Sequence, residues 1–247
     1  MRLDVCEGCR FQLLKATMEL EKITIDNEAT TRRWYDDACG TALAMELLGE
    51  RWSLLIVREL MFGPRRFGEV RGALAGLSAN VLTQRLDRLE TVGILARHKL
   101  PSPAFVHVYE LTALGYSAEV AIQELGRWAT QSPLHDPTLA FSAAAAMLSL
   151  RTMIDRTRSG AFTATVGFRF DRETFVATVD ANGIAIARQD PADADVIFET
   201  DPPTLAALVY GGRPIADAQA AGALTLKGDA RLAEMFVTLF PLPAKLA

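Results

Sequence analysis

The residues best suited to recognition chemistry lie between positions 78 and 92, where polar side chains recur at helical spacing. At about 100° per residue, Leu82, Leu86 and Leu89 share one side of a helix, and Asn80 and Gln84 fall opposite them. Amide side chains pair with adenine, arginine pairs with guanine, and threonine contacts the thymine methyl. This face therefore has the chemistry to read base edges, and its candidate residues are Ser78, Asn80, Thr83, Gln84, Arg85 and Arg88.

Cationic side chains flank this helix, although the 247-residue chain has a formal charge of −4. Residues 51–99 hold nine basic groups against four acidic ones. Cations beside a groove-bound helix can contact the phosphates of the backbone. The alternative is an ordinary solvated surface. The candidates for phosphate contact are Arg65, Arg66, Arg97, His98 and Lys99.

The surrounding pattern predicts the elements that would position these residues. Helices are expected over 38–48, 53–63, 67–74 and 78–92, with breaks at Gly63-Pro64 and Gly93. Period-two runs at 94–100 and 104–112 predict a β-hairpin, and an apolar stripe from 118 to 129 predicts a long helix. Three helices, a polar-faced fourth helix and a hairpin are the order of a winged helix-turn-helix, whose second helix of the turn motif enters the major groove.

A second domain follows the polar, proline-flanked segment 132–138, which reads as a linker. A helical segment to about 158 precedes alternating runs typical of strands, and the Asn182-Gly183 pair between two of them predicts a hairpin turn. Helices are expected after Asp201 and Pro214, and a short strand at 223–229 precedes a last helix. The order of elements is that of an α+β fold.

The first of these regions resembles a known family. The motifs LLGERWSLLIVREL, GPRRF and LSANVLTQRL, with VYELTALG and GRW after the hairpin, are similar to those of HxlR-type winged-helix transcription regulators over residues 34–131. The resemblance implies a DNA-binding homodimer that pairs through residues 38–48 and 117–129. It also implies backbone contacts from Arg65 and Arg66 and a wing that includes residues 97–99.

The C-terminal region resembles a second family. The stretch FETDPPTLAALVYGGRPIADAQAAGALTLKGD is similar to sterol-carrier-protein-like domains over about residues 140–243. The resemblance implies an apolar tunnel for a lipophilic ligand, although each apolar residue can equally be part of the core. The lining candidates are Phe168, Phe170, Phe175, Phe198, Leu205, Leu208, Met235 and Phe236.

The three cysteines are the remaining candidates for metal or redox chemistry. Cys6 and Cys9 form an isolated CxxC without a second ligand pair, so neither a zinc site nor a metal cofactor is expected. Cys39 precedes the first predicted helix, where the resemblance implies a redox or electrophile sensor in some relatives. A helix N-terminus can lower the pKa of a thiol, whereas the alternative for Cys39 is a small buried hydrophobe.

We therefore expect a homodimeric, cytoplasmic DNA-binding repressor that is not an enzyme and has no cofactor. Its second domain is expected to bind a small lipophilic effector or to support the dimer. The expected divisions are an extension at 1–33, the DNA-binding domain at 34–131, the linker at 132–138 and the second domain at 139–247. The alternatives are a sensor that works through Cys39, a lipid carrier with a vestigial DNA-binding domain, and a thiol redox protein that uses Cys6 and Cys9.

Overall fold

The computed structural model describes residues 35–100, 106–139, 141–160 and 162–246. The expected extension at 1–33, with Cys6 and Cys9, lies outside these residues. The chain divides into two units, Met1–Glu46 and Leu47–Ala247. Helix α2 (Gly40–Leu48) has no buried residue of its own, and its first turn is closed by a hydrogen bond from the Leu43 N–H to the Cys39 carbonyl.

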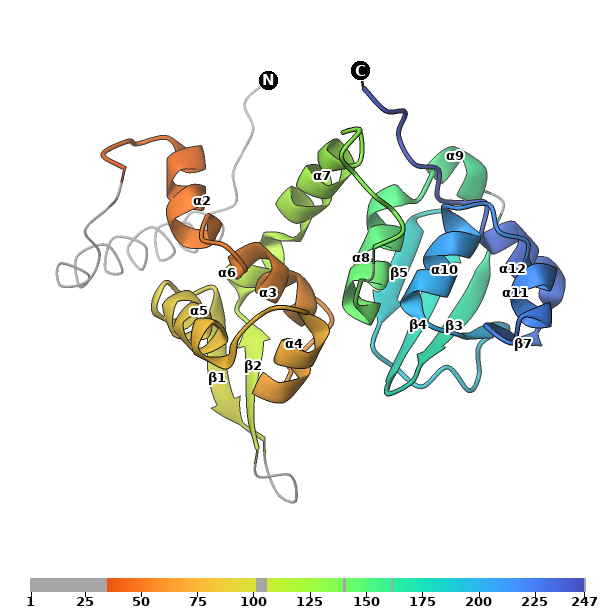
Figure 1. Ribbon diagram of the computed structural model, residues 1–247, viewed down its shortest axis with the longest axis horizontal. Helices are drawn as coiled ribbons and strands as arrows, with labels where there is room; N and C mark the ends of the chain where they lie inside the picture. The colour runs from red at the N-terminus through yellow and green to blue at the C-terminus, as the bar shows by residue number, and fades with distance from the viewer. Residues whose placement is uncertain (1–34, 101–105, 140, 161, 247) are drawn as a thin grey trace, which may run out of the picture. The chain divides into compact units, whose positions relative to one another are not determined.

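A winged helix-turn-helix opens the second unit, as the sequence predicts (Figure 1). Helix α3 ends before the Gly63-Pro64 break because proline cannot continue a helix. Helix α5 begins at the cap residue Ser78, whose side chain accepts a hydrogen bond from the Val81 N–H at 3.3 Å. The elements are α3 (Ser53–Leu60), α4 (Phe67–Ala73), α5 (Ala79–Thr91), β1 (Leu95–Lys99) and β2 (His107–Leu111).

The helical region after the wing begins earlier than predicted and is divided. The sequence predicts one helix over 118–129, whereas the structure has α6 (Ala113–Ser117) and α7 (Glu119–Ala129) on either side of Ala118. Thr112 caps α6 by accepting a hydrogen bond from the Gly115 N–H. Gly115 is required there, because a Cβ atom at this position would lie 2.1 Å from the Ile94 carbonyl oxygen.

The C-terminal domain has one five-stranded sheet in the order β5-β4-β3-β6-β7. Strands β3 and β6 are parallel and the other neighbours are antiparallel, which agrees with the predicted α+β class. The strands are β3 (Ala164–Phe170), β4 (Glu173–Asp180), β5 (Gly183–Ala187), β6 (Val196–Glu199) and β7 (Thr225–Gly228). The helices are α8 (Ala143–Met153), α9 (Arg156–Ser159), α10 (Pro202–Val209), α11 (Ile215–Ala220) and α12 (Ala230–Phe236).

The hairpin between β4 and β5 is confirmed, with its turn one residue earlier than the Asn-Gly pair suggests. Asp180 pairs with Gly183, so Ala181 and Asn182 form the two-residue loop. The Asp180 carboxylate accepts a hydrogen bond from the Asn182 N–H at 2.7 Å, and Gly183 has a φ of +123° that favours glycine.

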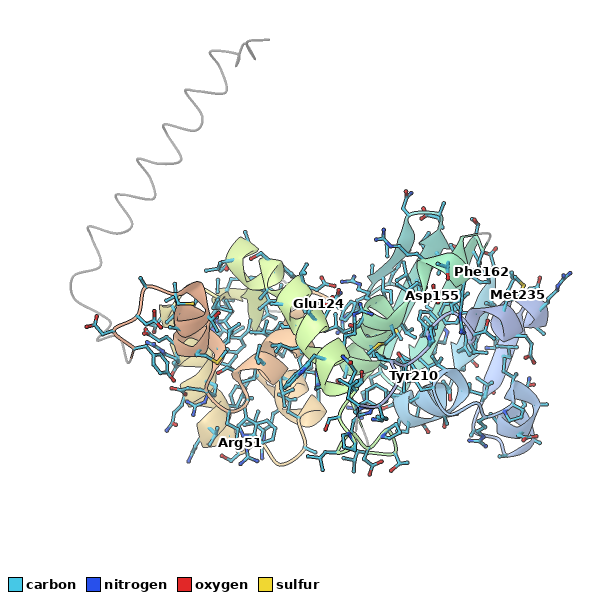
Figure 2. All side chains as sticks on the ribbon, turned by 90° about the horizontal axis from the view of Figure 1, so that it is seen from above. Arg51, Glu124, Asp155, Phe162, Tyr210 and Met235 are labelled. Atoms are coloured by element: carbon cyan, nitrogen blue, oxygen red, sulfur yellow. The ribbon has the colours of Figure 1, made fainter. Side chains whose placement is uncertain are left out.

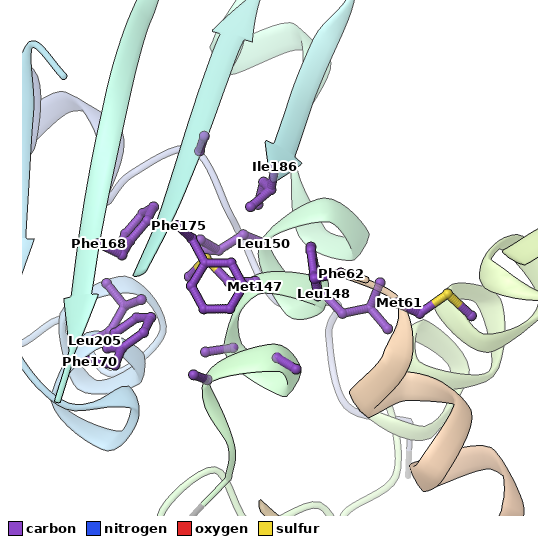
Figure 3. Close-up of a cluster of buried hydrophobic side chains, with 14 of the residues drawn as sticks. Met61, Phe62, Met147, Leu148, Leu150, Phe168, Phe170, Phe175, Ile186 and Leu205 are labelled. Atoms are coloured by element: carbon purple, nitrogen blue, oxygen red, sulfur yellow. The ribbon is translucent and has the colours of Figure 1, made fainter. Parts of the chain in front are cut away.

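The buried core continues from the winged helix into the C-terminal domain (Figure 3). Phe62, just beyond α3, meets Phe175 of β4 edge to face, with ring centroids 5.5 Å apart. Edge-to-face aromatic pairs add to the stability that burial alone provides. The side chains of Met147 and Leu150 on α8 lie in the same cluster. The two domains of this unit therefore share apolar packing.

Candidate nucleic-acid interface

Helix α5 is anchored through the face that the sequence predicts. Leu82, Leu86 and Leu89 are all fully buried, and burying a leucine side chain contributes roughly 1.5–3 kcal/mol. Gly93 ends the helix in a left-handed conformation with a φ of +75°. This arrangement fixes which side of α5 is available to a ligand.

The outer face of α5 presents polar side chains. Asn80, Thr83 and Gln84 are exposed, and Arg88 is half-buried. The Thr83 hydroxyl donates to the Ala79 carbonyl at 3.1 Å, which leaves its methyl group for an apolar contact. Amides, a methyl group and a guanidinium on one helix face match the functional groups that DNA bases present in the major groove.

Two of the predicted DNA-contact residues, Arg85 and Ser78, already have hydrogen-bond partners within the protein. The Arg85 Nε atom donates to the Arg51 carbonyl oxygen at 3.1 Å, and the guanidinium forms an ion pair with Glu50. Arg85 therefore ties α5 to the turn before α3. The Ser78 hydroxyl caps the first turn of α5. Direct base contact by either side chain stays a prediction. To contact a base, each side chain would have to divide its hydrogen bonds between the base and these partners.

The expected phosphate contact of Arg65 is corrected by its burial. The side chain is only 6% exposed, and its guanidinium lies 3.2 Å from Glu59 and 2.8 Å from Glu173. The backbone explains why this side chain is buried. The Arg65 and Tyr109 backbones form an antiparallel bridge, with hydrogen bonds of 2.9 Å from the Arg65 N–H and 2.8 Å from the Tyr109 N–H. Successive side chains of an extended segment point to opposite sides, so Arg65 points inward and Arg66 is exposed.

Glu59 is the centre of a buried polar network that joins the winged helix to the C-terminal domain. Its carboxylate is fully buried and accepts hydrogen bonds from Arg58 at 2.8 Å, Arg65 at 3.2 Å and Ser142 at 2.6 Å. Glu173 of β4 binds Arg65 and also Arg188. Burying a charge is costly unless it is paired and hydrogen-bonded, and these partners meet that requirement for Glu59.

The wing places its basic residues in solvent. Arg97, His98 and Lys99 are exposed on β1. The Arg97 guanidinium lies 5.9 Å from the centroid of the Tyr109 ring, and the His98 ring nitrogen Nε2 lies 3.4 Å from a Glu110 oxygen. Their proposed contacts with phosphates stay predictions, together with that of Arg66.

The predicted ligand-lining residues belong mostly to the aromatic core. The Phe168 ring packs against Phe170, Phe198 and Phe236 with centroids 5.8 to 5.9 Å apart. Phe175, Leu205 and Leu208 are also buried, whereas Met235 is 42% exposed on α12 (Figure 2). Their role in ligand binding stays a prediction.

A mainly apolar pocket lies elsewhere, and no sequence motif indicated it. Its volume is about 380 Å³, and it is bounded by Arg58 of α3, α7, α8, residues 135–137 with Leu139 and Phe141, the end of α10 and Leu242. The eight predicted residues do not belong to its lining. The pocket draws on six separated parts of the chain, so residue spacing could not have revealed it.

Cys39 is exposed and directly precedes α2. Its backbone N–H donates to the Asp37 carboxylate at 2.8 Å. Hydrogen bonds from the backbone and side chain of Thr41 lower the pKa of the thiol. The alternative of a buried hydrophobe is therefore wrong for this residue.

Among the described residues there is no cluster of three histidine, cysteine or acidic side chains able to hold a metal ion. The helices within the same part of the chain are too short or too polar to cross a membrane.

Comparison with known proteins gives two family matches. The HxlR-like helix-turn-helix family matches residues 47–136, and the SCP-2 sterol transfer family matches residues 151–241. The first match contains α3 to α7, and the second contains the sheet with α9 to α12. Both resemblances inferred from the sequence are therefore confirmed.

Individual relatives agree with the first match. The chain is 38% identical over 88 residues to the uncharacterized HTH-type transcriptional regulator YvaP of Bacillus subtilis, with 36% of this chain and 82% of that one covered. It is 39% identical over 88 residues to the regulator YodB of the same species, with 36% and 79% covered. The solved reduced form of YodB is 35% identical, with 40% of this chain and 100% of that one covered and a TM-score of 0.37. The chain therefore belongs to the HxlR-like helix-turn-helix family of DNA-binding transcriptional regulators, and its residues 151–241 match the SCP-2 sterol transfer family.

Proposed function

We propose that the protein is a homodimeric, sequence-specific repressor that inserts α5 into the major groove. Asn80, Thr83 and Gln84 would contact base edges, while Arg66 and Arg97 would contact flanking phosphates. The observation that carries this proposal is the division of α5 into a fully buried leucine face and an exposed polar face. The groups exposed on that second face are those that discriminate bases in the major groove.

Helix α7 supports the proposed dimer. None of its residues from Glu119 to Ala129 is buried, and Val120, Leu125 and Trp128 are 68%, 46% and 68% exposed. These three side chains lie on one half of the helix circumference at 100° per residue. Exposed aromatic and aliphatic side chains grouped in this way are typical of protein interfaces. A second copy of the chain is the proposed partner.

Repression is the proposed outcome because a dimer bound across a promoter blocks access of the polymerase. A small lipophilic effector would change this outcome only if it bound the DNA-competent and DNA-incompetent states with different affinities. The apolar pocket beside α7 supports the effector part of the proposal.

Two substitutions test the assignment of roles on the interface. Gln84→Ala is expected to weaken binding to the cognate operator by about 1–3 kcal/mol and to change binding to random DNA little. Arg66→Ala is expected to weaken binding to both and to reduce the slope of log K against log salt by about one unit. Fluorescence anisotropy on both DNAs, over a series of salt concentrations, measures these effects.

Asp217→Ala, an exposed change on α11 in the C-terminal domain, serves as the control and should behave like the wild type. Equal losses from Gln84→Ala and Arg66→Ala on every DNA sequence would contradict the roles proposed for them.

A second candidate function is thiol sensing, which the exposure and lowered pKa of Cys39 favour. In a variant with Cys6→Ser and Cys9→Ser, Cys39 is the remaining one of the three cysteines. The rate of its alkylation by iodoacetamide should rise with a midpoint below the ordinary thiol pKa of about 8.5. Benzoquinone should then weaken operator binding by this variant and leave the further Cys39→Ser variant unaffected. An ordinary midpoint, or equal responses of the two proteins, would rule out a sensing role for Cys39.

A further inference from the structure

The pocket beside α7 has the form of a small-molecule site. Its volume of about 380 Å³ falls within the roughly 300–1,000 Å³ of known ligand pockets. Ile122 from α7, Leu148 from α8 and Phe141 from the segment between them contribute apolar walls. Leu242, near the end of the chain, contributes another. The site therefore belongs jointly to the winged helix and the C-terminal domain, and not to the aromatic core around Phe168.

The polar groups of the pocket are mainly hydroxyls. The Tyr210 hydroxyl, beyond the end of α10 (Figure 2), donates to the Ser149 oxygen at 2.9 Å. Ser149 in turn donates to the Ala146 carbonyl at 2.7 Å. Burial raises the pKa of Tyr210, so its phenol stays protonated. With its proton directed to Ser149, the Tyr210 oxygen can still accept a hydrogen bond from a ligand.

The charged groups of the lining disfavour an anionic ligand. Arg58 lines the pocket, but its Nε and Nη2 atoms donate to Glu59 at 3.1 and 2.8 Å. Asp136 also lines the pocket, and hydrogen bonds from Thr138 lower the pKa of its carboxyl group, which keeps it negative. Burial and the Lys245 ammonium group lower the pKa of His135, so this imidazole is neutral near pH 7.

We infer that this pocket binds a compact, uncharged lipophilic molecule with a hydrogen-bond donor that reaches the hydroxyl oxygens of Tyr210 and Ser149. The inference rests on the proposed function, because it names the effector site of the regulator. Ile122, Gly126 and Ala129 of α7 line the pocket, while Val120, Leu125 and Trp128 are exposed on the rest of that helix. A ligand that displaces α7 would therefore displace the proposed dimer surface.

Arg58 gives the pocket a second connection to the DNA-binding helices. It lines the pocket and donates to Glu59, which also binds Arg65. Arg65 directly precedes Arg66, the exposed cation proposed to contact phosphate. A ligand that moved Arg58 would thus act on the network that holds the segment leading into α4.

The neutral environment-sensitive dye N-phenyl-1-naphthylamine, whose N–H can donate a hydrogen bond, tests the site in the full-length protein. Its emission is expected to shift to the blue with saturable one-to-one binding. Ala129→Phe, which places an aromatic ring in the pocket wall, should lower the affinity for the dye by about tenfold or more. Ala216→Phe introduces the same side chain at an exposed position of α11 outside the lining, so it should bind the dye as the wild type does. Leu242→Trp fills the pocket from another segment and should reproduce the loss if Ala129→Phe folds poorly.

Competition tests the chemical class of the ligand. The neutral alcohol 1-decanol should displace the dye, and decanoate should require a concentration about tenfold higher or more. Absent dye binding, equal losses in Ala216→Phe and Ala129→Phe, or equal displacement by the alcohol and the anion would overturn the inference. Operator binding without ligand is measured separately, so failure of this site is distinguishable from failure of the proposed DNA-binding function.

Discussion

Replacing Arg65 with alanine is expected to lower the free energy of unfolding by about 3–5 kcal/mol, because it leaves Glu59 buried with part of its charge uncompensated. Glu59 is fully buried, and Arg65 is only 6% exposed. Glu173 loses a 2.8 Å partner in the same change. Urea denaturation followed by circular dichroism, at constant pH and salt concentration, measures this loss.

The neighbouring residue provides a matched control. Arg66→Ala removes the same type of side chain from an exposed position, where substitutions usually change stability by less than about 0.5 kcal/mol. The two variants should therefore separate clearly, with Arg65→Ala affecting stability and Arg66→Ala affecting DNA affinity. An Arg65→Ala variant as stable as the wild type, with a reduced salt dependence of DNA binding, would restore Arg65 as a phosphate contact.

Trp128→Glu is expected to convert the proposed dimer into monomers and to weaken binding to a two-half-site operator by about 10²–10⁴-fold. The charged side chain would be desolvated against an apolar partner surface, and the second half-site would no longer bind at a high effective concentration. Sedimentation velocity reports the mass of the particle, and anisotropy reports its affinity for whole and half operators.

Leu134→Glu is the control for this prediction. Leu134 is 91% exposed on the segment after α7, so the same loss of an apolar side chain and gain of charge should leave the mass and affinity unchanged. Affinity for an isolated half-site should be similar in the wild type and Trp128→Glu. A Trp128→Glu protein that remains dimeric and binds the whole operator normally would exclude α7 from the interface.

Local patterns were sufficient to predict the interface helix. The spacing of Leu82, Leu86 and Leu89 identified the buried face of α5, and Ser78 identified its first turn. Both are consequences of helical periodicity and end capping, which act over a few residues. The winged-helix order and the β4–β5 hairpin were predictable for the same reason, apart from shifts at the Asn-Gly turn and at Ala118.

Long-range partners were not predictable. Arg65 and Arg66 have the same side chain, and only the bridge between Arg65 and Tyr109 shows which of them points inward. The acidic partner of Arg65 in the second domain, Glu173, lies 108 positions along the chain. The pocket likewise depends on how α7 meets α8 and Leu242, which no local spacing determines.

We propose that two copies of α5 read DNA in a sequence-specific way. Selection of genomic DNA fragments bound by the purified wild-type protein, followed by sequencing, tests it most directly. We expect one enriched near-palindrome whose half-sites lie about 10–10.5 base pairs apart, centre to centre, or a multiple of this spacing. Enrichment without a common motif, or a single motif without a symmetric partner, would contradict a two-fold, sequence-reading dimer.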